Sequence, residues 1–303
     1  MPAAWLWIPI TVWAAFAQTL RNAAQRHLTA ELGTLGATLV RFLYGLPFAF
    51  AWLWGVQAVT RLPLPDPAAA FWLWVLIAGV SQIVATALLL RVMAERNFAL
   101  GVAYSKTEII QVAVFAFVFL GDRVNLVTGL AIACGTFGVL LLSPADKARP
   151  LRAMLTGWTS RTALIGLASG TGFALAAVGY RGAALALNAQ FLMAGAYTLI
   201  AAQLVQTLLL GGWLLARNPD VVRRVLRAWR ASLFAGFMGA AASAGWFTAM
   251  AIEPVAHVRI LGLVELLFSY VVSRRVFRER LSRIELGGIA LLTLGLVIVT
   301  LAR

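Results

Sequence analysis

The chain has 303 residues, of which 62% are hydrophobic and only 12% charged, and its formal net charge is +14. This composition excludes an ordinary soluble domain, in which about a quarter of the residues are charged. Cys134, the only cysteine, and the two histidines exclude a disulfide framework and a zinc site, and the basic residues form no nucleic-acid-binding motif.

Apolar runs follow one another along the whole chain. Each is long enough to cross a hydrocarbon core of about 30 Å, which takes roughly 20 residues. Ten transmembrane helices are predicted, at residues 4–23, 33–58, 70–92, 98–120, 124–142, 162–181, 189–214, 231–251, 255–273 and 284–302. The N-terminus has no positively charged segment, so we expect no cleavable signal peptide. The predicted fold class is an all-α, multi-pass membrane protein.

The sequence repeats itself when it is shifted by 157 positions. Glu108 then aligns with Glu265, Arg123 with Arg280, and Gly138 with Gly295. The predicted domains are a first five-helix repeat at 1–142, a linker at 143–160 that contains proline, charge and serine, and a second five-helix repeat at 161–303. Since five is odd, the second repeat must insert in the opposite orientation. Two inverted repeats are typical of secondary transporters, which bind their substrate where the repeats meet.

Lysine and arginine are distributed unequally between the two sides of the predicted membrane protein. The loops after the first, third, fifth, seventh and ninth helices hold 18 of the 25 basic residues, with Arg21 counted in the first of these loops. The opposite side holds Arg61, Arg123, Arg181 and Arg303. Cytoplasmic loops concentrate lysine and arginine, so this asymmetry predicts that both termini lie outside.

Two carboxylates fall inside predicted helices. A charge at the middle of a bilayer costs at least ~2.5–3.5 kcal/mol, so a retained one usually faces a polar interior. Glu108 lies near the middle of the fourth helix, and Glu265 lies at the equivalent point of the ninth. We expect Glu108 to exchange a proton or to contact the substrate; the alternative is a buried ion pair that joins two helices. The same two interpretations apply to Glu265, where neither is favoured.

Three basic residues also fall inside predicted helices. Lys106 lies two positions before Glu108 and points to another helix face, so Glu265 across the repeat interface is its candidate partner. Arg41 and Arg259 lie near helix ends, which favours snorkelling towards the headgroups, although both remain candidates for substrate binding. Three cations against two anions favour an anionic or zwitterionic substrate.

Polar and aromatic residues inside the predicted helices are further candidates for lining a binding cavity. The alternatives for each are an interhelical hydrogen bond or an interfacial anchor. The residues retained as candidates are Gln82, Tyr104 and Trp246.

The turns after the fourth and ninth helices carry a motif. The first reads Phe119-Leu120-Gly121-Asp122-Arg123 and the second Val276-Phe277-Arg278-Glu279-Arg280, and a glycine-rich helix follows each. This pattern resembles the EamA-type ten-helix permeases of the drug/metabolite transporter superfamily, which have a Leu-Gly-Glu-Arg-like turn. Asp122 replaces the glutamate here, and Arg278 replaces the glycine. The resemblance implies export or exchange of amino acids, nucleosides, sugars or drugs, without selecting among them.

The same resemblance bears on proton coupling and orientation. Small four-helix relatives bind a proton at a glutamate in their first helix, but the first predicted helix here has no acidic residue. If protons are coupled, Glu108 and Glu265 are the replacements. Relatives are usually pictured with cytoplasmic termini, which is opposite to the orientation that the basic residues predict.

The sequence therefore predicts a secondary transporter in a bacterial inner membrane. We expect it to move an amino acid or similar metabolite, by export and alternating access, as a lipid-embedded monomer or homodimer without cofactor or metal. Uncoupled facilitation and the carriage of a lipid intermediate remain alternatives, as does a membrane assembly subunit. An enzyme is not expected, because the chain lacks a nucleophile with a base or a metal set.

Overall fold

A computed structural model describes residues 5–95, 108–121 and 161–277, together with scattered positions at 126–137 and 287–298. The described residues are almost entirely helical and include no β-strand. The predicted helices at 124–142 and 284–302, the linker at 143–160 and the first part of 98–120 lie outside these ranges or are only sparsely covered. The number of ten helices and the inverted repeat therefore stay predictions.

The first half of the chain contributes α1 (Trp7–Leu43), α2 (Leu46–Thr60), α3 (Ala69–Glu95) and α5 (Glu108–Leu120). Helix α1 is interrupted at Gly33, which has φ 69° and ψ 172°, a backbone conformation that side chains other than glycine rarely adopt. Residues Trp7–Thr60 form one apolar run of 54 residues, about twice what a single crossing needs. The break at Gly33 divides this run into two segments, each of which is long enough for one crossing.

The second half contributes α8 (Arg161–Ala186), then α9 (Phe191–Gln206), which continues through a π-helical turn, η3 (Thr207–Gly211), into α10 (Gly212–Arg217). The short α11 (Pro219–Arg227) leads to α12 (Trp229–Ile252). The helix predicted at 255–273 is observed as two shorter helices, α13 (Val255–Leu261) and α14 (Val264–Phe277), with a break that the prediction did not include. Discontinuous helices are a recurrent feature of secondary transporters.

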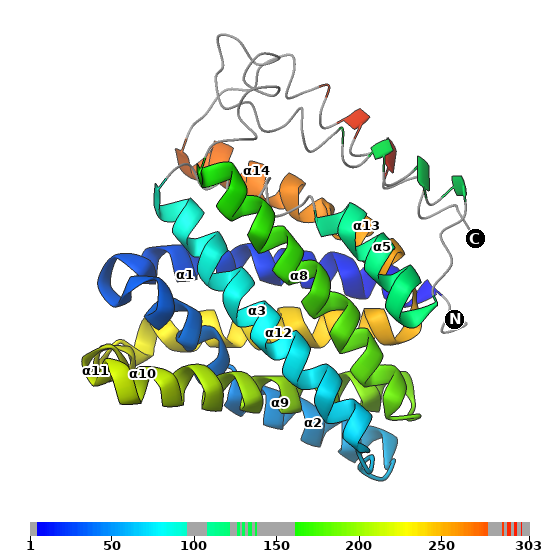
Figure 1. Cartoon of the computed structure of the whole chain (residues 1–303), viewed down its shortest axis with the longest axis horizontal. Coiled ribbons are helices and arrows are strands. Elements are labelled where there is room, and N and C mark those ends of the chain that lie inside the picture. Colours follow the sequence, from blue (N-terminus) through cyan, green and yellow to red (C-terminus); the bar gives the residue numbers. More distant parts are fainter. Residues whose placement is uncertain are drawn as a thin grey trace.

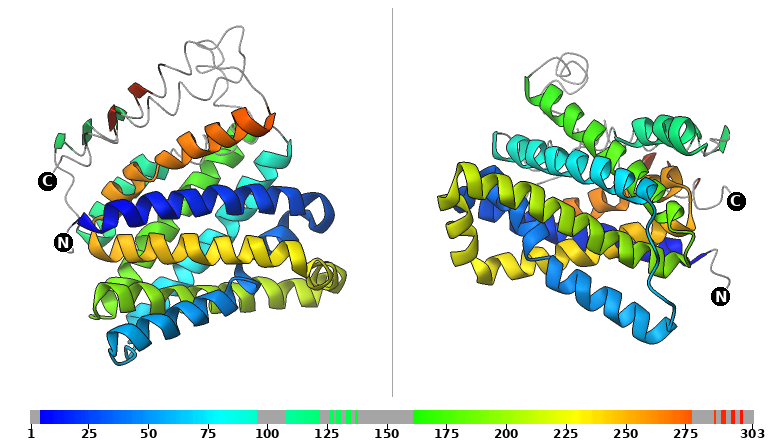
Figure 2. Two further views of the ribbon diagram at one scale, coloured as in Figure 1. Left: turned by 180° about the vertical axis from the view of Figure 1, so that it is seen from behind. Right: turned by 60° about the horizontal axis from the view of Figure 1, so that its bottom comes forward.

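The helices of the two halves pack against each other in pairs. Helix α1 lies along α12, and α3 lies along α8; α2 packs on α9, and α5 packs on α13. Figure 2 (left) shows α1 and α12 side by side. In Figure 1, α1 and α8 run in opposite directions, as do α2 and α9, and α3 and α12. Opposite directions of corresponding helices, such as α1 and α8, are what an inverted repeat requires, and the repeat itself stays a prediction.

Small residues bring the paired helices close together. A Cβ atom at Gly245 of α12 would lie 2.8 Å from Ala14 Cβ of α1, and one at Gly179 of α8 would lie 2.8 Å from Ala78 Cβ of α3. Glycine and alanine at such points allow helices in a membrane to approach closely and gain van der Waals contact. The α1–α12 and α3–α8 interfaces, the most extensive among the described helices, therefore depend on small side chains.

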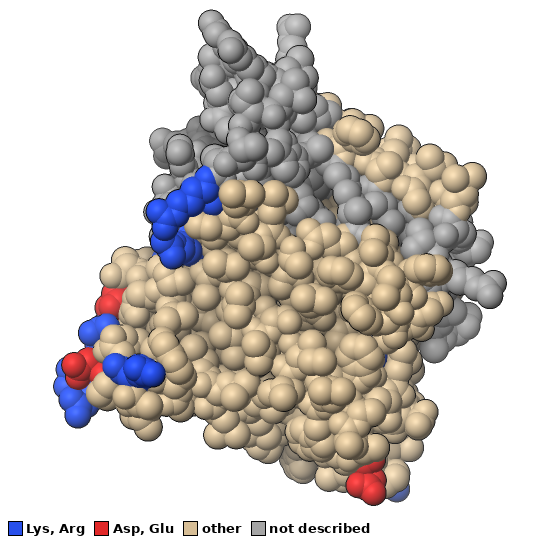
Figure 3. Space-filling view, in the orientation of Figure 1, with Lys and Arg blue, Asp and Glu red and all other residues tan. Residues whose placement is uncertain are grey.

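Basic side chains gather at one end of the molecule, around α10, α11 and the start of α8, as Figure 3 shows. The described residues of this end include Arg217, Arg223, Arg224 and Arg227, which were predicted in the loop after the seventh helix. Two residues in the count of basic residues were assigned wrongly: Arg21 is 2% exposed inside α1, and Arg181 is 9% exposed inside α8. The Arg181 guanidinium donates to the carbonyl oxygens of Met250 and Glu253. Without these two residues the split is 17 to 3, so the asymmetry keeps its direction.

Candidate functional site

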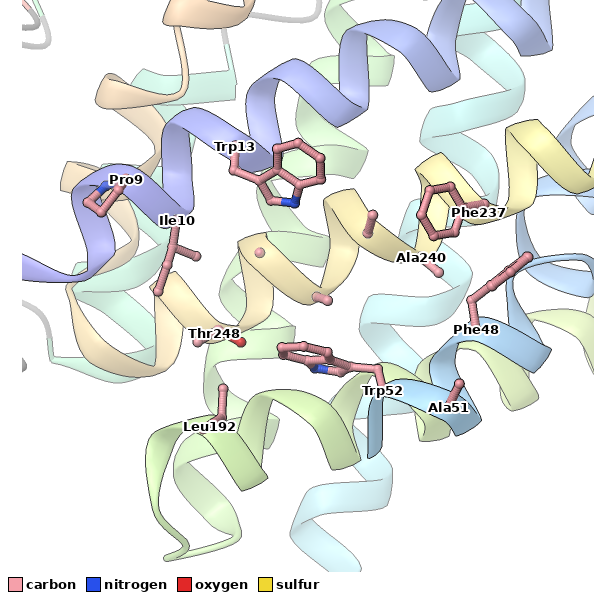
Figure 4. Close-up of a pocket in the computed structure, with 13 residues that line it drawn as sticks. Pro9, Ile10, Trp13, Phe48, Ala51, Trp52, Leu192, Phe237, Ala240 and Thr248 are labelled. Atoms are coloured by element: carbon pink, nitrogen blue, oxygen red, sulfur yellow. The ribbon is translucent and has the colours of Figure 1, made fainter. Parts of the chain in front are cut away.

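One cavity is an apolar groove of about 620 Å³ between α1, α2, α9 and α12 (Figure 4). No charged side chain lines it, and three of its aromatic residues, Trp13, Trp52 and Phe237, are 39–49% exposed at the molecular surface. In a membrane protein such a surface faces the lipid chains. The groove offers a polar solute no partner, so its volume alone does not make it the substrate site.

A second cavity, the polar cavity, lies on the other side of α12. Its volume is about 20 Å³, which is room for a single water molecule. Ser243, Trp246 and Phe247 of α12 face this cavity, whereas Ala244 and Gly245 face the apolar groove. The polar cavity is lined by Gln18, Arg21, Asn22, Arg41, Gln82, Leu89, Glu108, Phe173, Tyr180, Ser243, Trp246, Phe247, Arg259 and Glu265. Two carboxylates and three guanidiniums thus meet between helices of both halves, which makes this the candidate site.

Glu108 lies in the first turn of α5 and is 3% exposed. Its Oε1 accepts a hydrogen bond from Arg259 Nη1 at 3.3 Å, so the pair joins α5 to α13. The Arg259 guanidinium also lies 5.0 Å from the centre of the Trp246 ring, within the range of a cation–π contact. The ion pair foreseen as an alternative for Glu108 is therefore present, and it forms part of the cavity wall.

Glu265 occupies the equivalent place in the second half, in the first turn of α14, and is 1% exposed. Its two carboxylate oxygens accept hydrogen bonds from Gln18 Nε2 at 2.7 Å and from Asn22 Nδ2 at 3.0 Å. Both amides come from α1, so Glu265 ties α14 to α1. A carboxylate in the first turn of a helix is also favoured by the helix dipole.

The α1 residues Gln18, Arg21 and Asn22 were missed by the sequence analysis. They lie three and four positions apart and therefore share one helix face. That spacing of polar residues was legible in the sequence, but Arg21, near the end of the helix predicted at 4–23, was counted with the loop that follows. In the structure Arg21 Nη2 donates to Asn22 Oδ1 at 2.7 Å, and its Nη1 makes no hydrogen bond.

The snorkelling interpretation of Arg41 and Arg259 is wrong. Arg41 is 3% exposed, and its Nη1 donates to Thr86 Oγ1 of α3 at 3.2 Å. The side chain of Arg259 is only 10% exposed and is held by Glu108. Arg41 lies about two turns past the break at Gly33, and Arg259 lies in the short helix α13, so both point into the bundle and not to its ends.

Gln82 takes part in a hydrogen-bonded cluster with two other buried residues. Its Oε1 accepts hydrogen bonds from Tyr180 Oη at 2.9 Å and from Gln206 Nε2 at 2.7 Å. The Tyr180 ring stacks at 4.3 Å on Phe247. This cluster links α3, α8, α9 and α12 and forms an aromatic wall beside the charged groups.

Six of the eight predicted site residues are described, and all six line the polar cavity: Arg41, Gln82, Glu108, Trp246, Arg259 and Glu265. The other two, Tyr104 and Lys106, lie outside the described residues, as does the predicted contact of Lys106 with Glu265. Across the described ranges no cluster of three His, Cys, Asp or Glu residues could hold a metal ion. The roles of the six residues in binding stay predictions.

Comparison with known proteins gives one family and one fold. Residues 5–143 match the EamA-like transporter family, part of the drug/metabolite transporter superfamily, which confirms the resemblance noted in the sequence. No protein of curated function matches the chain. Among the solved structures that match is a crystal structure that aligns with a TM-score of 0.72 at 15% sequence identity, and the alignment covers 99% of this chain and 97% of the other. At that identity the likeness establishes a shared fold and nothing further.

Proposed function

We propose that the chain is a secondary transporter of a small organic solute, because residues 5–143 match the EamA-like transporter family, whose members are membrane transporters of the drug/metabolite type. The solute is an amino acid or a similar metabolite, and it is exported across a bacterial inner membrane. The observation that carries the proposal is the polar cavity, where two carboxylates and three guanidiniums are buried between the two halves. Charges retained inside a membrane protein mark substrate or ion pathways.

The packing of the helices supports alternating access. The cavity is walled by α1, α3 and α5 of the first half and by α8, α12, α13 and α14 of the second. With room for only one water, this conformation is closed around its centre. Separation of the paired helices at either end opens the cavity to that side.

We assign proton exchange to Glu108. Protonation of its carboxyl group removes the negative charge that holds Arg259, so the guanidinium is released towards the cavity. Proton binding at Glu108 thereby determines whether the positive charge of Arg259 is available to the solute. Glu265, held by two neutral amides of α1, is the second candidate for this role.

Transport in proteoliposomes tests the proposal. The purified protein is reconstituted with a pH-sensitive dye inside, and single amino acids and organic acids are added outside, with radiolabelled uptake measured in parallel. A proton movement that requires both the solute and the protein is expected. Uptake without proton movement favours an uncoupled facilitator, and the absence of both across the panel contradicts transport of this class.

The distribution of basic residues makes a separate prediction about orientation. Since both termini are expected outside, alkaline phosphatase fused after Arg303 should be active in the periplasm, and a fusion in the 274–283 segment should be inactive. The activity of each fusion, normalised to its expression level, is the measurement. The reverse pattern contradicts the predicted orientation and matches the one usually pictured for the family.

A further inference from the structure

We propose that the transported solute carries an oxyanion, a carboxylate or a phosphate, and that this group binds between Arg21 and Arg41 in the polar cavity. The inference rests on the proposed function, because it names the substrate class for the same site. It is carried by the charges that the described part of the cavity leaves unneutralised.

The two carboxylates of the cavity are engaged elsewhere. Glu108 pairs with Arg259, and the carboxylate oxygens of Glu265 accept hydrogen bonds from Gln18 and Asn22. Among the described residues, no carboxylate lies within ion-pair distance of Arg21 or Arg41. Asn22 connects Arg21 to Glu265 through its amide, but this bridge leaves Arg41 without a counter-charge.

The hydrogen bonds of these arginines are also incomplete. A guanidinium has five N–H donors. Arg21 uses Nε and Nη2 on one acceptor, Asn22 Oδ1, and its buried Nη1 has none. Arg41 donates one hydrogen bond, to the hydroxyl of Thr86. With 2% and 3% exposure, neither side chain can recover the missing partners from bulk water. Buried charges without partners are costly, so the site is built to receive an anion.

The two side chains lie against the same point of α12. A Cβ atom at Gly239 would lie 3.2 Å from Arg41 Cγ and 3.4 Å from Arg21 Cδ, so the two stems pack side by side over this glycine. Arg21 comes from the part of α1 before the break at Gly33, and Arg41 comes from the part after it. Their charges repel each other and Arg259 adds to this repulsion, whereas the Glu265 carboxylate offsets part of it at Arg21. An oxyanion between the two guanidinium groups accepts paired, charge-assisted hydrogen bonds and relieves the repulsion between the two positive charges.

The test compares four compounds that share a benzene ring, which suits the aromatic wall of Tyr180 and Phe247, and differ in their polar group. Benzoate and phenyl phosphate carry the two oxyanions, benzamide is neutral, and benzylamine is a cation. The melting temperature of the full chain in a neutral detergent is measured against the concentration of each. One or both anions are expected to raise it, because a ligand that binds only the folded state stabilises it. The anion that raises it identifies the carboxylate or the phosphate as the group bound.

Variants of Arg41 separate binding from structure. Arg41→Gln should weaken the apparent affinity for the anion roughly tenfold or more, while the melting temperature without ligand stays equal to or above that of the wild type. Arg41→Lys keeps the charge but loses the fork, and should give an intermediate affinity. If Arg41→Gln does not fold, Arg41→Lys still reports the loss of affinity.

Three results overturn the inference: neither anion shifts the melting temperature, benzamide or benzylamine shifts it as much as the anions do, or Arg41→Gln melts lower and keeps the anion response. Each leaves the proposed transport function standing if proteoliposome transport of another solute is measured. Conversely, an anion response that depends on Arg41, in a protein without transport activity, sustains the anion site and overturns the transport proposal.

Discussion

Glu108→Gln is expected to abolish uphill, proton-driven transport while the protein still folds. Glutamine has nearly the volume of glutamate, and its side-chain oxygen can still accept the hydrogen bond from Arg259 Nη1. What it cannot do is bind and release a proton. We expect solute-dependent proton movement to fall to the level of protein-free liposomes, and downhill exchange of labelled solute to persist. The loss of the charged partner should lower the free energy of unfolding by about 1–3 kcal/mol.

Glu253→Gln is the matched control. Glu253 is also a buried carboxylate, 8% exposed, and its Oε1 lies 2.7 Å from Nδ1 of His257. It follows the end of α12 and does not line the polar cavity. The variant loses a buried carboxylate charge, as Glu108→Gln does, so it should share a loss of stability but keep coupled transport.

The competing interpretation is that the ion pair between Glu108 and Arg259 has only a structural role. If the pair only joins α5 to α13, Glu108→Gln should transport normally and melt at a lower temperature. In that case the double variant Glu108→Gln/Arg259→Gln should regain part of the stability, because no uncompensated guanidinium remains. That pair of results would establish a structural role and contradict proton exchange at Glu108.

Much of this site could be predicted because charges are rare in apolar helices. The shift of 157 positions singled out Glu108 and Glu265, and the structure brings both to one cavity. Hydropathy also located most of the described helices within a few residues of their observed ends. The repeated glutamates and the hydropathy of the helices are both informative because placing a charge or an unpaired backbone group in a membrane costs free energy in every membrane protein.

The remainder could not be predicted because hydropathy does not distinguish a polar residue in a loop from one buried inside a bundle. Arg21 was assigned to a loop, although α1 continues to the break at Gly33 and encloses it. Arg41 and Arg259 were placed near helix ends along the chain, although tertiary packing turns both inwards. The break between α13 and α14 was missed since no proline marks it and the residues on both sides are apolar.

Gly262→Val is expected to disrupt both the fold around the cavity and transport. Gly262 lies at the break between α13 and α14 with φ −59° and ψ −14°, a conformation that any residue adopts, so space is its constraint. A Cβ atom there would lie 2.5 Å from Trp246 Cη2 and 3.0 Å from Cζ3. Overpacking of this kind costs about 1–3 kcal/mol. We expect a lower melting temperature and transport near background in proteoliposomes.

The position of Trp246 explains why the effect should reach the site. Its Nε1 donates to Gln18 Oε1 at 3.0 Å, and Gln18 in turn holds Glu265. The indole also carries Arg259 over its face. A valine at 262 therefore pushes on a ring that orders a carboxylate and a guanidinium of the cavity together. Displacement of the ring loosens both groups at once.

Two further variants decide whether this packing is the cause. Gly212→Val makes the same substitution at a helical position where an added Cβ atom meets nothing within 4 Å, so it should leave transport intact and change stability little. Trp246→Leu on the Gly262→Val background removes the obstructing ring and should restore folding. It should not restore transport, because Gln18 and Arg259 then lose their indole partner. Equal behaviour of Gly262→Val and Gly212→Val would instead show that the ring moves aside freely, and that the cavity does not depend on its position.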